Sequence, residues 1–398
     1  MQAIFEPTSL PSPADGVQGL RERCATLPHV CFVAPATWPV LAGDAAIPVV
    51  GGAEVQQKLI ATGLARRGYR VSMICHDYGQ PEGAQVDGVR VYKMHKPDEG
   101  IPVLRFLHPR LTSLWRALKR VDADIYYQRT AAPHTGFIAA FCALHGRRSI
   151  YAGASDDDFA THTQEIRYAR DRLIFRYGLR NVDRIIVQNP VQRARVRANH
   201  GRESTLIANC YAPPAQARAD CAGYVLWVGA LRAQKRPEMF LELARLLPRY
   251  RFVMIGGGDR GRKGEAYAQG IRAAAQALPN LEFKGFLPYP QADRHFDGAR
   301  LLVSTSLCEG FPNTFLQAWA RGVPTVGFVD PGVRRDGRPV SLIVAETGQA
   351  KDEVERLMSD DDAWRDASQR ALAHFDACHS VDSALDSYER EFQELMRA

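Results

Sequence analysis

The segment around residue 310 holds the side chains best suited to chemistry. Glu309 and Gly310 follow an apolar run typical of a strand, and Asn313 and Thr314 lie where a helix is predicted to begin. Glycine lets the backbone approach a ligand, and the first turn of a helix leaves N–H groups unpaired, so this turn could hold a diphosphate. Glu309 at its mouth could then accept hydrogen bonds from sugar hydroxyls. The alternative is an N-capping loop with an incidental carboxylate.

A glycine pair, Gly51 and Gly52, precedes another predicted helix at 53–67. Glycines at such a position let the backbone face an anion, and the alternative is a tight turn with no ligand. The pair is not a G-x-G-x-x-G fingerprint, which argues against a nicotinamide cofactor.

These segments must be positioned by elements that alternate strand-like and helix-like patterns. The predicted strands are 29–34, 70–75, 124–127, 148–151 and 184–187, then 224–228, 251–255, 281–284, 300–304 and 324–328. The predicted helices between them are 53–67, 133–144, 171–180 and 190–199, then 237–247, 265–278, 291–296 and 314–321. Repeated alternation predicts mostly parallel sheets covered by helices on both faces. The expected fold class is α/β, with two Rossmann-like domains.

Composition gives the expected boundaries of these domains. Residues 1–28 contain four prolines and little periodicity, so they are predicted to be a loosely ordered lead-in. Residues 29–207 form the first domain and 208–378 the second, with prolines 213 and 214 at the junction. Residues 379–398 are predicted to be a helix that packs back on the N-terminal domain. Its apolar face consists of Ala384, Tyr388, Phe392 and Leu395.

The string at 309–324, E-G-F-P-N-T-F-L-Q-A-W-A-R-G-V-P, resembles the donor-site signature of glycosyltransferase family 4. Its members are retaining enzymes of GT-B fold, in which two Rossmann-like domains face each other across a cleft. The likeness extends over nearly the whole chain. It includes Gly-Gly-Ala-Glu at 51–54, Ile-Ile-Val-Gln-Asn at 185–189, residues 207–209, Trp-Val-Gly at 227–229 and Lys-Arg-Pro-Glu at 235–238.

The resemblance implies roles for this signature. Glu309 matches the first carboxylate of an E-x7-E motif, which contacts the donor sugar, while Phe311, Asn313 and Thr314 match the segment that holds sugar and diphosphate. The second glutamate of the motif, which bonds the ribose hydroxyls, falls on Gln317. An amide can still accept a hydrogen bond from a hydroxyl and can also donate one, so we expect weakened or altered nucleotide binding rather than none.

The resemblance also implies two cations on the donor diphosphate. Arg232 and Lys235 lie in the corresponding loop and would neutralise the leaving diphosphate, with Glu309 completing the expected catalytic group. Relatives often place an arginine directly after the glycine, where this chain has Ala230, and we expect Arg232 to replace it. Gly51 and Gly52 would face the donor phosphates from across the cleft.

Acceptor-side candidates lie in the N-terminal domain. Several relatives have a histidine near the reacting carbon, and the comparable strand end here carries Arg129, with His134 slightly beyond; the alternative for His134 is a structural role. Asp158 ends a triple-aspartate loop that could contact acceptor hydroxyls or simply be solvated. No metal site is expected, because three consecutive side chains do not converge readily on one ion.

Composition fits a folded chain of two domains. The 398 residues include 46% hydrophobic and 24% charged residues, and eight cysteines form no C-x-x-C pair. The net charge of +7 favours anionic partners such as nucleotide phosphates or an acidic membrane surface, although a solvated basic surface is the simpler explanation. No dense basic run with aromatics indicates nucleic acid. Without an apolar span or signal peptide, the chain is expected in the cytoplasm, at most peripheral to the inner face of the plasma membrane.

The expected function is metal-independent, retaining transfer of a hexose-like sugar, in cell-surface polysaccharide or glycolipid biosynthesis. The donor would be a nucleotide sugar, most simply a UDP- or GDP-sugar, with no further cofactor, and the acceptor a glycan or a lipid-linked molecule. The alternatives are a nucleotide-sugar epimerase of the same fold, a catalytically idle binding protein and, least favoured, a dehydrogenase.

Overall fold

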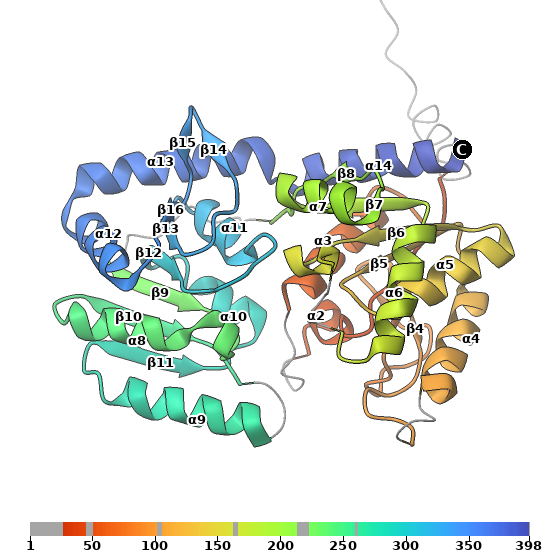
Figure 1. Cartoon of the computed structure of the whole chain (residues 1–398), viewed down its shortest axis with the longest axis horizontal. Helices are drawn as coiled ribbons and strands as arrows, with labels where there is room; N and C mark the ends of the chain where they lie inside the picture. The colour runs from red at the N-terminus through yellow and green to blue at the C-terminus, as the bar shows by residue number, and fades with distance from the viewer. Residues whose placement is uncertain are drawn as a thin grey trace, which may run out of the picture.

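Two parallel β-sheets, each with its own helices, make up the computed structural model of the chain (Figure 1). The structure describes residues 27–44, 51–101, 106–161, 166–212, 223–258 and 262–397. Most of the predicted lead-in at 1–28 therefore lies outside the described residues. The predicted α/β class is confirmed.

The first sheet has eight strands in the order β3-β4-β2-β1-β5-β6-β7-β8, parallel except where β3 pairs with β4. Its strands are β1 (Val30–Val33), β2 (Val71–Cys75), β3 (Gln85–Val86), β4 (Val89–Lys93), β5 (Ile125–Arg129), β6 (Arg148–Ala152), β7 (Arg184–Val187) and β8 (Thr205–Leu206). Every residue of β1, β2 and β5 is buried, as expected of central strands with helices on both faces. The helices are α2 (Trp38–Ala42), α3 (Gly52–Arg66), α4 (Thr112–Val121), α5 (His134–His145), α6 (Ala169–Asn181) and α7 (Pro190–His200), with short turns η2 (Leu107–Leu111) and η3 (Asp156–Phe159).

The second sheet has six strands, all parallel, in the order β11-β10-β9-β12-β13-β16. Its strands are β9 (Tyr224–Val228), β10 (Arg251–Ile255), β11 (Leu281–Gly285), β12 (Ala299–Ser304), β13 (Thr325–Gly327) and β16 (Leu342–Ile343), and β14 (Arg334–Arg335) pairs with β15 (Arg338–Pro339) in a hairpin. The helices are η4 (Ala233–Lys235), α8 (Pro237–Leu246), α9 (Arg262–Gln276), α10 (Tyr289–Arg294), α11 (Asn313–Trp319), α12 (Thr347–Ser359), α13 (Asp361–Cys378) and α14 (Val381–Arg397).

Both sheets reverse strand order at one point. In the first sheet β1 pairs with β2 on one side and β5 on the other, and in the second β9 lies between β10 and β12. In open α/β sheets, ligands bind beyond the carboxyl ends of the strands at such switch points. Loops 229–236 and 305–312 follow β9 and β12, and Arg129 ends β5. The predicted site residues therefore cluster where the topology favours a ligand.

Helix α14 returns to the first half of the chain. Figure 1 shows α13 and α14 running along one side of the molecule, α13 beside the second sheet and α14 beside the first. Leu385, Tyr388 and Phe392 belong to the same buried core as β1 and β2. A Cβ at Gly63 of α3 would lie 2.7 Å from Leu385, so glycine at this position lets the two helices approach closely.

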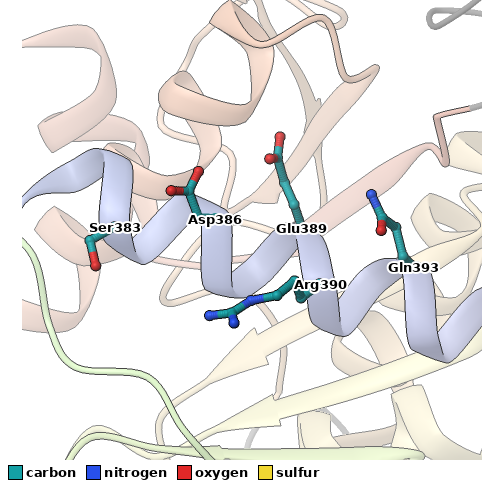
Figure 2. Close-up of a pocket in the computed structure, with 5 residues that line it drawn as sticks. All are labelled: Ser383, Asp386, Glu389, Arg390 and Gln393. Carbon is teal, nitrogen blue, oxygen red and sulfur yellow. The ribbon is translucent and has the colours of Figure 1, made fainter.

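An ion cluster covers the edge of this contact. Arg67 pairs with Asp382 at 3.0 Å, Asp386 at 2.6 Å and Glu389 at 3.0 Å, all on α14. A hollow of about 430 Å³ lies beside them (Figure 2). It is lined by Ser383, Asp386, Glu389, Arg390 and Gln393. All of its lining residues come from α14, and none belongs to the loops at the switch points, so the hollow is not part of the candidate site.

Candidate active site

Two loops of the second half form one unit after the adjacent strands β9 and β12. The Thr305 hydroxyl donates to the Lys235 carbonyl at 2.6 Å, and the Leu307 amide donates to the Gln234 carbonyl at 2.9 Å. Arg236 donates in turn to the Thr305 carbonyl at 2.7 Å. These bonds fix the cationic loop against the segment that carries Glu309.

Lys235 and Glu309 form an ion pair between these loops. Their side chains retain 29% and 16% exposure, so both charged groups face the same accessible space. An ammonium group here can bind a diphosphate, and a carboxylate beside it can accept from sugar hydroxyls. The structure thus brings together two of the three residues predicted to be catalytic.

Glycines let neighbouring loops approach in this half. A Cβ at Gly256 would lie 2.1 Å from the Gly229 carbonyl oxygen, so a larger residue would force the loops apart. The Leu231 amide donates to the Gly257 carbonyl at 2.8 Å, which fixes the start of the cationic loop. The loop that carries Arg232 and Lys235 is therefore held from both sides.

The donor loop also docks on the first half of the chain through two glycines. A Cβ at Gly310 would lie 2.5 Å from the Ala154 carbonyl oxygen, and a Cβ at Gly52 would lie 2.4 Å from Nδ2 of Asn313. Asn189 donates to the Gly310 carbonyl at 3.0 Å. Gly52, Gly310 and Asn313, predicted separately as donor-binding, thus meet at one interface, while Gly51 is the residue that precedes α3.

Buried amides connect the two halves. Oδ1 of Asn313 accepts from Asn209 at 3.0 Å and from Gln56 at 3.2 Å, and Oδ1 of Asn209 accepts from Arg129 at 2.8 Å. Sequence reasoning assigned no role to Gln56 or to the Asn209 amide. The signal was present for Gln56, which lies one turn before Ile60 on the buried face of α3, where a polar residue needs a partner.

Glu54 indicates where Arg232 lies. A Cβ at Gly51 would lie 2.1 Å from Oε2 of Glu54, so this carboxylate folds back over the start of its own helix. Burial raises the pKa of Glu54, and a backbone N–H together with the positive charges of Arg129 and Arg232 acts against that rise. The charge of Arg232, on the exposed loop of the second half, thus acts in the same direction as that of Arg129 on the Glu54 carboxyl.

Phe311, Thr314 and Gln317 of the 309–324 signature have surroundings other than the contact with the first half that Gly310 and Asn313 make. Phe311 is buried against the rings of Trp319 and His379, at centroid distances of 5.9 and 5.1 Å, so it anchors the loop in the core. Thr314 follows Asn313 in α11 and is partly buried. Gln317 is 5% exposed and donates to Asp293 at 2.6 Å, a partner that the sequence did not predict.

The acceptor-side candidates are less closely grouped. Arg129 is buried and its guanidinium is bonded to Asn209, so it supports the interface. His134 begins α5, and burial together with the nearby charges of His76, His95 and Arg110 lowers its pKa to about 3, which leaves its imidazole neutral at pH 7. Within the described residues, no hydrogen bond joins His134 to the donor loop.

Asp158 differs from the solvated loop that was considered for it. Residues Asp156–Phe159 form η3, capped by Ser155, and Asp158 is only 1% exposed. Its Oδ2 accepts from the Tyr151 hydroxyl at 3.0 Å and from the Ala154 amide at 2.7 Å. A carboxylate used in this way fixes the loop on which Gly310 rests, rather than presenting itself to an acceptor.

This burial predicts a dependence of stability on pH. Burial raises the pKa of Asp158 from 3.8 to about 6, so between these values the folded state binds more protons than the unfolded state, and stability falls as pH rises. As the pH rises from 5 to 7, the unfolding free energy of the wild type should therefore fall by about 1 kcal/mol more than that of Asp158→Asn. Urea denaturation at both pH values measures this difference. Asp157→Asn is the control; the same pH response in both variants would contradict this account.

Metal-binding clusters and membrane-spanning helices are both absent from the described part of the chain. No three His, Cys, Asp or Glu side chains in these ranges are grouped so that they could hold a metal ion. No helix in the same ranges combines the length and apolar character needed to cross a bilayer.

Family comparison agrees with this geometry in both halves of the chain. Residues 51–210 match the model of the glycosyl transferase 4-like domain, and residues 222–360 match that of glycosyl transferases group 1. The chain belongs to the group 1 glycosyltransferases. The resemblance first drawn from the 309–324 signature is therefore confirmed.

Individual relatives of this group 1 glycosyltransferase are more distant. The D-inositol 3-phosphate glycosyltransferase of Mycobacterium leprae is 31% identical over 180 residues, which is 42% of this chain and 41% of that protein. The match thus spans about two fifths of the relative's length. The sucrose-phosphate synthase of Thermosynechococcus elongatus superposes with a TM-score of 0.75 at 17% identity, over 93% of this chain and 99% of that one.

A second solved structure supports the same architecture. HepE from Anabaena, in complex with UDP and glucose, superposes with a TM-score of 0.72 at 14% identity, over 92% of this chain and 100% of that one. At such identities the likeness shows the fold alone. The predicted GT-B architecture is confirmed.

Proposed function

We propose that this group 1 glycosyltransferase moves a hexose-like sugar from a nucleotide-sugar donor to an acceptor hydroxyl, with retention of anomeric configuration. The observation that supports this most is the Lys235–Glu309 pair, in which a cation and a carboxylate share one accessible space at the switch point of the second sheet. The cation can bind a diphosphate, and the carboxylate can accept hydrogen bonds from the attached sugar. Family membership supports the same class of reaction.

In the proposed reaction, the bond between the anomeric carbon and the diphosphate oxygen breaks while the acceptor oxygen bonds to that carbon on the same face. The acceptor proton passes to the departing diphosphate. Lys235 and Arg232, rather than a divalent cation, neutralise the charge that develops there, and Glu309 orients the sugar through its hydroxyls. The contact between the two halves at Gly310 and Asn313 would exclude water and so limit hydrolysis of the donor.

The proposed donor is a UDP- or GDP-sugar. The UDP and glucose in complex with the Anabaena protein support the first of these. The proposed acceptor is a glycan or a lipid-linked molecule of surface polysaccharide or glycolipid biosynthesis, bound in the cytoplasm by the first half of the chain. The name of the mycobacterial relative contains a phosphorylated molecule, D-inositol 3-phosphate. An anionic acceptor for this chain is compatible with that name.

Peripheral contact with an anionic membrane is part of this proposal. Helix α6 presents exposed Leu173 and Tyr177 on the same face as exposed Arg180, a combination suited to acidic headgroups. Co-sedimentation with phosphatidylglycerol vesicles, lost in Leu173→Glu/Tyr177→Glu, would support this contact. Equal sedimentation of the variant, or none of the wild type, would refute it.

The function is tested by incubating the protein with UDP-, GDP- and ADP-hexoses, with and without polyprenyl-phosphate or oligosaccharide acceptors, while proton NMR follows the anomeric signals. A product with the donor's anomeric configuration supports retaining transfer. Conversion of the donor to its epimer without acceptor would identify an epimerase instead. Nucleotide binding without any turnover would identify an idle binding protein.

A further inference from the structure

A buried charged cluster surrounds the position where the family's second glutamate is replaced. Arg321, 3% exposed, pairs with Asp293 at 2.8 Å and with Asp297 at 2.5 Å. The Tyr211 hydroxyl lies 2.9 Å from both oxygens of Asp293. The Asp293 side chain on α10 is thus held in place by an arginine and a phenol.

Gln317 is bound to this cluster through one end of its amide. Its Nε2 donates to Oδ1 of Asp293 at 2.6 Å, and a carboxylate can only accept, so the nitrogen must face Asp293 and the oxygen must face away. No donor among the described residues bonds that oxygen, and it is not among the buried polar atoms that lack a partner. The amide oxygen therefore keeps contact with solvent.

The position of Gln317 in α11 indicates where that oxygen faces. Gln317 follows Asn313 by four residues, so the two side chains lie on the same face of the helix. Asn313 faces the first half of the chain, where it meets Gly52 and Asn209. The free end of the Gln317 amide thus lies on the side of α11 that faces the first half of the chain.

We infer that Asp293 is a positioning residue, which holds the Gln317 amide so that its oxygen accepts a hydrogen bond from a ribose hydroxyl of the nucleotide. This rests on the proposed function. Gln317 and Asp293 together then bind the ribose hydroxyls as the second glutamate of the motif does in relatives. Glutamine at position 317 is therefore compatible with a functional nucleotide site. This inference predicts ordinary ribose recognition, whereas the sequence predicts weakened or altered nucleotide binding.

The charges around residue 317 predict that glutamate, the family's residue at this position, binds nucleotide less well here than glutamine. Arg321 already balances the charge of Asp293, while Asp297 is 36% exposed, so a glutamate at 317 would place a second carboxylate against Asp293 without a further buried cation. Gln317→Glu restores the family's residue, yet here it should weaken nucleotide binding about tenfold. Gln317→Glu/Asp293→Asn restores both the net charge and a donor–acceptor pair, and should return the affinity to within about threefold of wild type.

The experiment measures, by calorimetry, the affinity for the nucleoside diphosphate that the wild type binds and for its 2′,3′-dideoxy analogue. Wild type should prefer the ribose form about tenfold, and Gln317→Ala and Asp293→Ala, which remove the amide and its acceptor, should abolish that preference. Gln276→Glu, which adds the same charge at an exposed site of α9, should behave as wild type. Circular dichroism checks that each variant is folded.

The outcomes distinguish the two proposals. If the wild type binds no nucleoside diphosphate, the proposed function itself fails. If it binds one and Gln317→Ala retains the full preference for ribose, or Gln317→Glu binds more tightly than wild type, the inference about Asp293 is overturned and the proposed function stands.

Discussion

Lys235→Ala is expected to lower kcat about 10²- to 10³-fold with the natural donor. Lys235 lies against Glu309 in the accessible space at the switch point, and removing one preorganised group that stabilises developing charge costs this much in other enzymes. The Tm should change little, because the side chain is partly exposed and the backbone of its loop is held by Thr305. Steady-state transfer rates and thermal unfolding of the same preparations measure both quantities.

Lys351 on α12 offers a matched control outside the donor loops. Lys351 is also partly exposed and paired with a carboxylate, Glu355 at 3.0 Å, but it lies on α12 and not in the donor loops. Lys351→Ala should retain wild-type kcat. Equal activity of Lys235→Ala and Lys351→Ala would remove Lys235 from the catalytic group.

Gly310→Ala should lower kcat/KM about 100-fold through a single methyl group. That methyl would lie 2.5 Å from the Ala154 carbonyl oxygen and 3.1 Å from Cα of Ser155, both backbone atoms that cannot rotate away. The donor loop must therefore shift from the first half, which also strains the bond from Asn189 to the Gly310 carbonyl. A displacement of about 1 Å in a reacting geometry can cost about two orders of magnitude.

Gly270→Ala controls for the general effect of adding a methyl group. Gly270 is in α9, and a Cβ there would meet no atom within 4 Å, so this variant should keep full activity and gain slight stability. Small-angle scattering of Gly310→Ala should show a more open molecule. Wild-type kinetics and dimensions in Gly310→Ala would show that the contact at Ala154 is not needed for transfer.

Much of the fold followed from local pattern. Strand β9 was predicted with its observed bounds, Tyr224–Val228, because its apolar run is enclosed between Gly223 and Gly229. Helix α13 was not predicted within the range assigned to the second domain. Its buried face consists largely of small or polar residues, such as Ala367, Ser368 and Ala371, and so lacks the strong apolar periodicity of a typical amphipathic helix.

Some contacts of the candidate site could likewise be predicted from local sequence, and others could not. Glu309 and Lys235 were predicted because the signature and the loop position place them after adjacent strands. The Asp293 partner of Gln317 was not, because the two residues are 24 positions apart and meet only through the packing of α10 against α11. The amides of Gln56 and Asn209 meet Asn313 only when the two halves of the chain dock, and no local pattern encodes that contact.

The central claim is that the space between Lys235 and Glu309 binds the diphosphate of a nucleotide sugar. Calorimetric titration of the wild-type protein with UDP, GDP and ADP tests it most directly, with Lys235→Ala measured beside it. We predict saturable binding of one of these nucleotides, weakened at least tenfold in Lys235→Ala. Absence of binding by all three, or equal binding by the variant, would contradict the account.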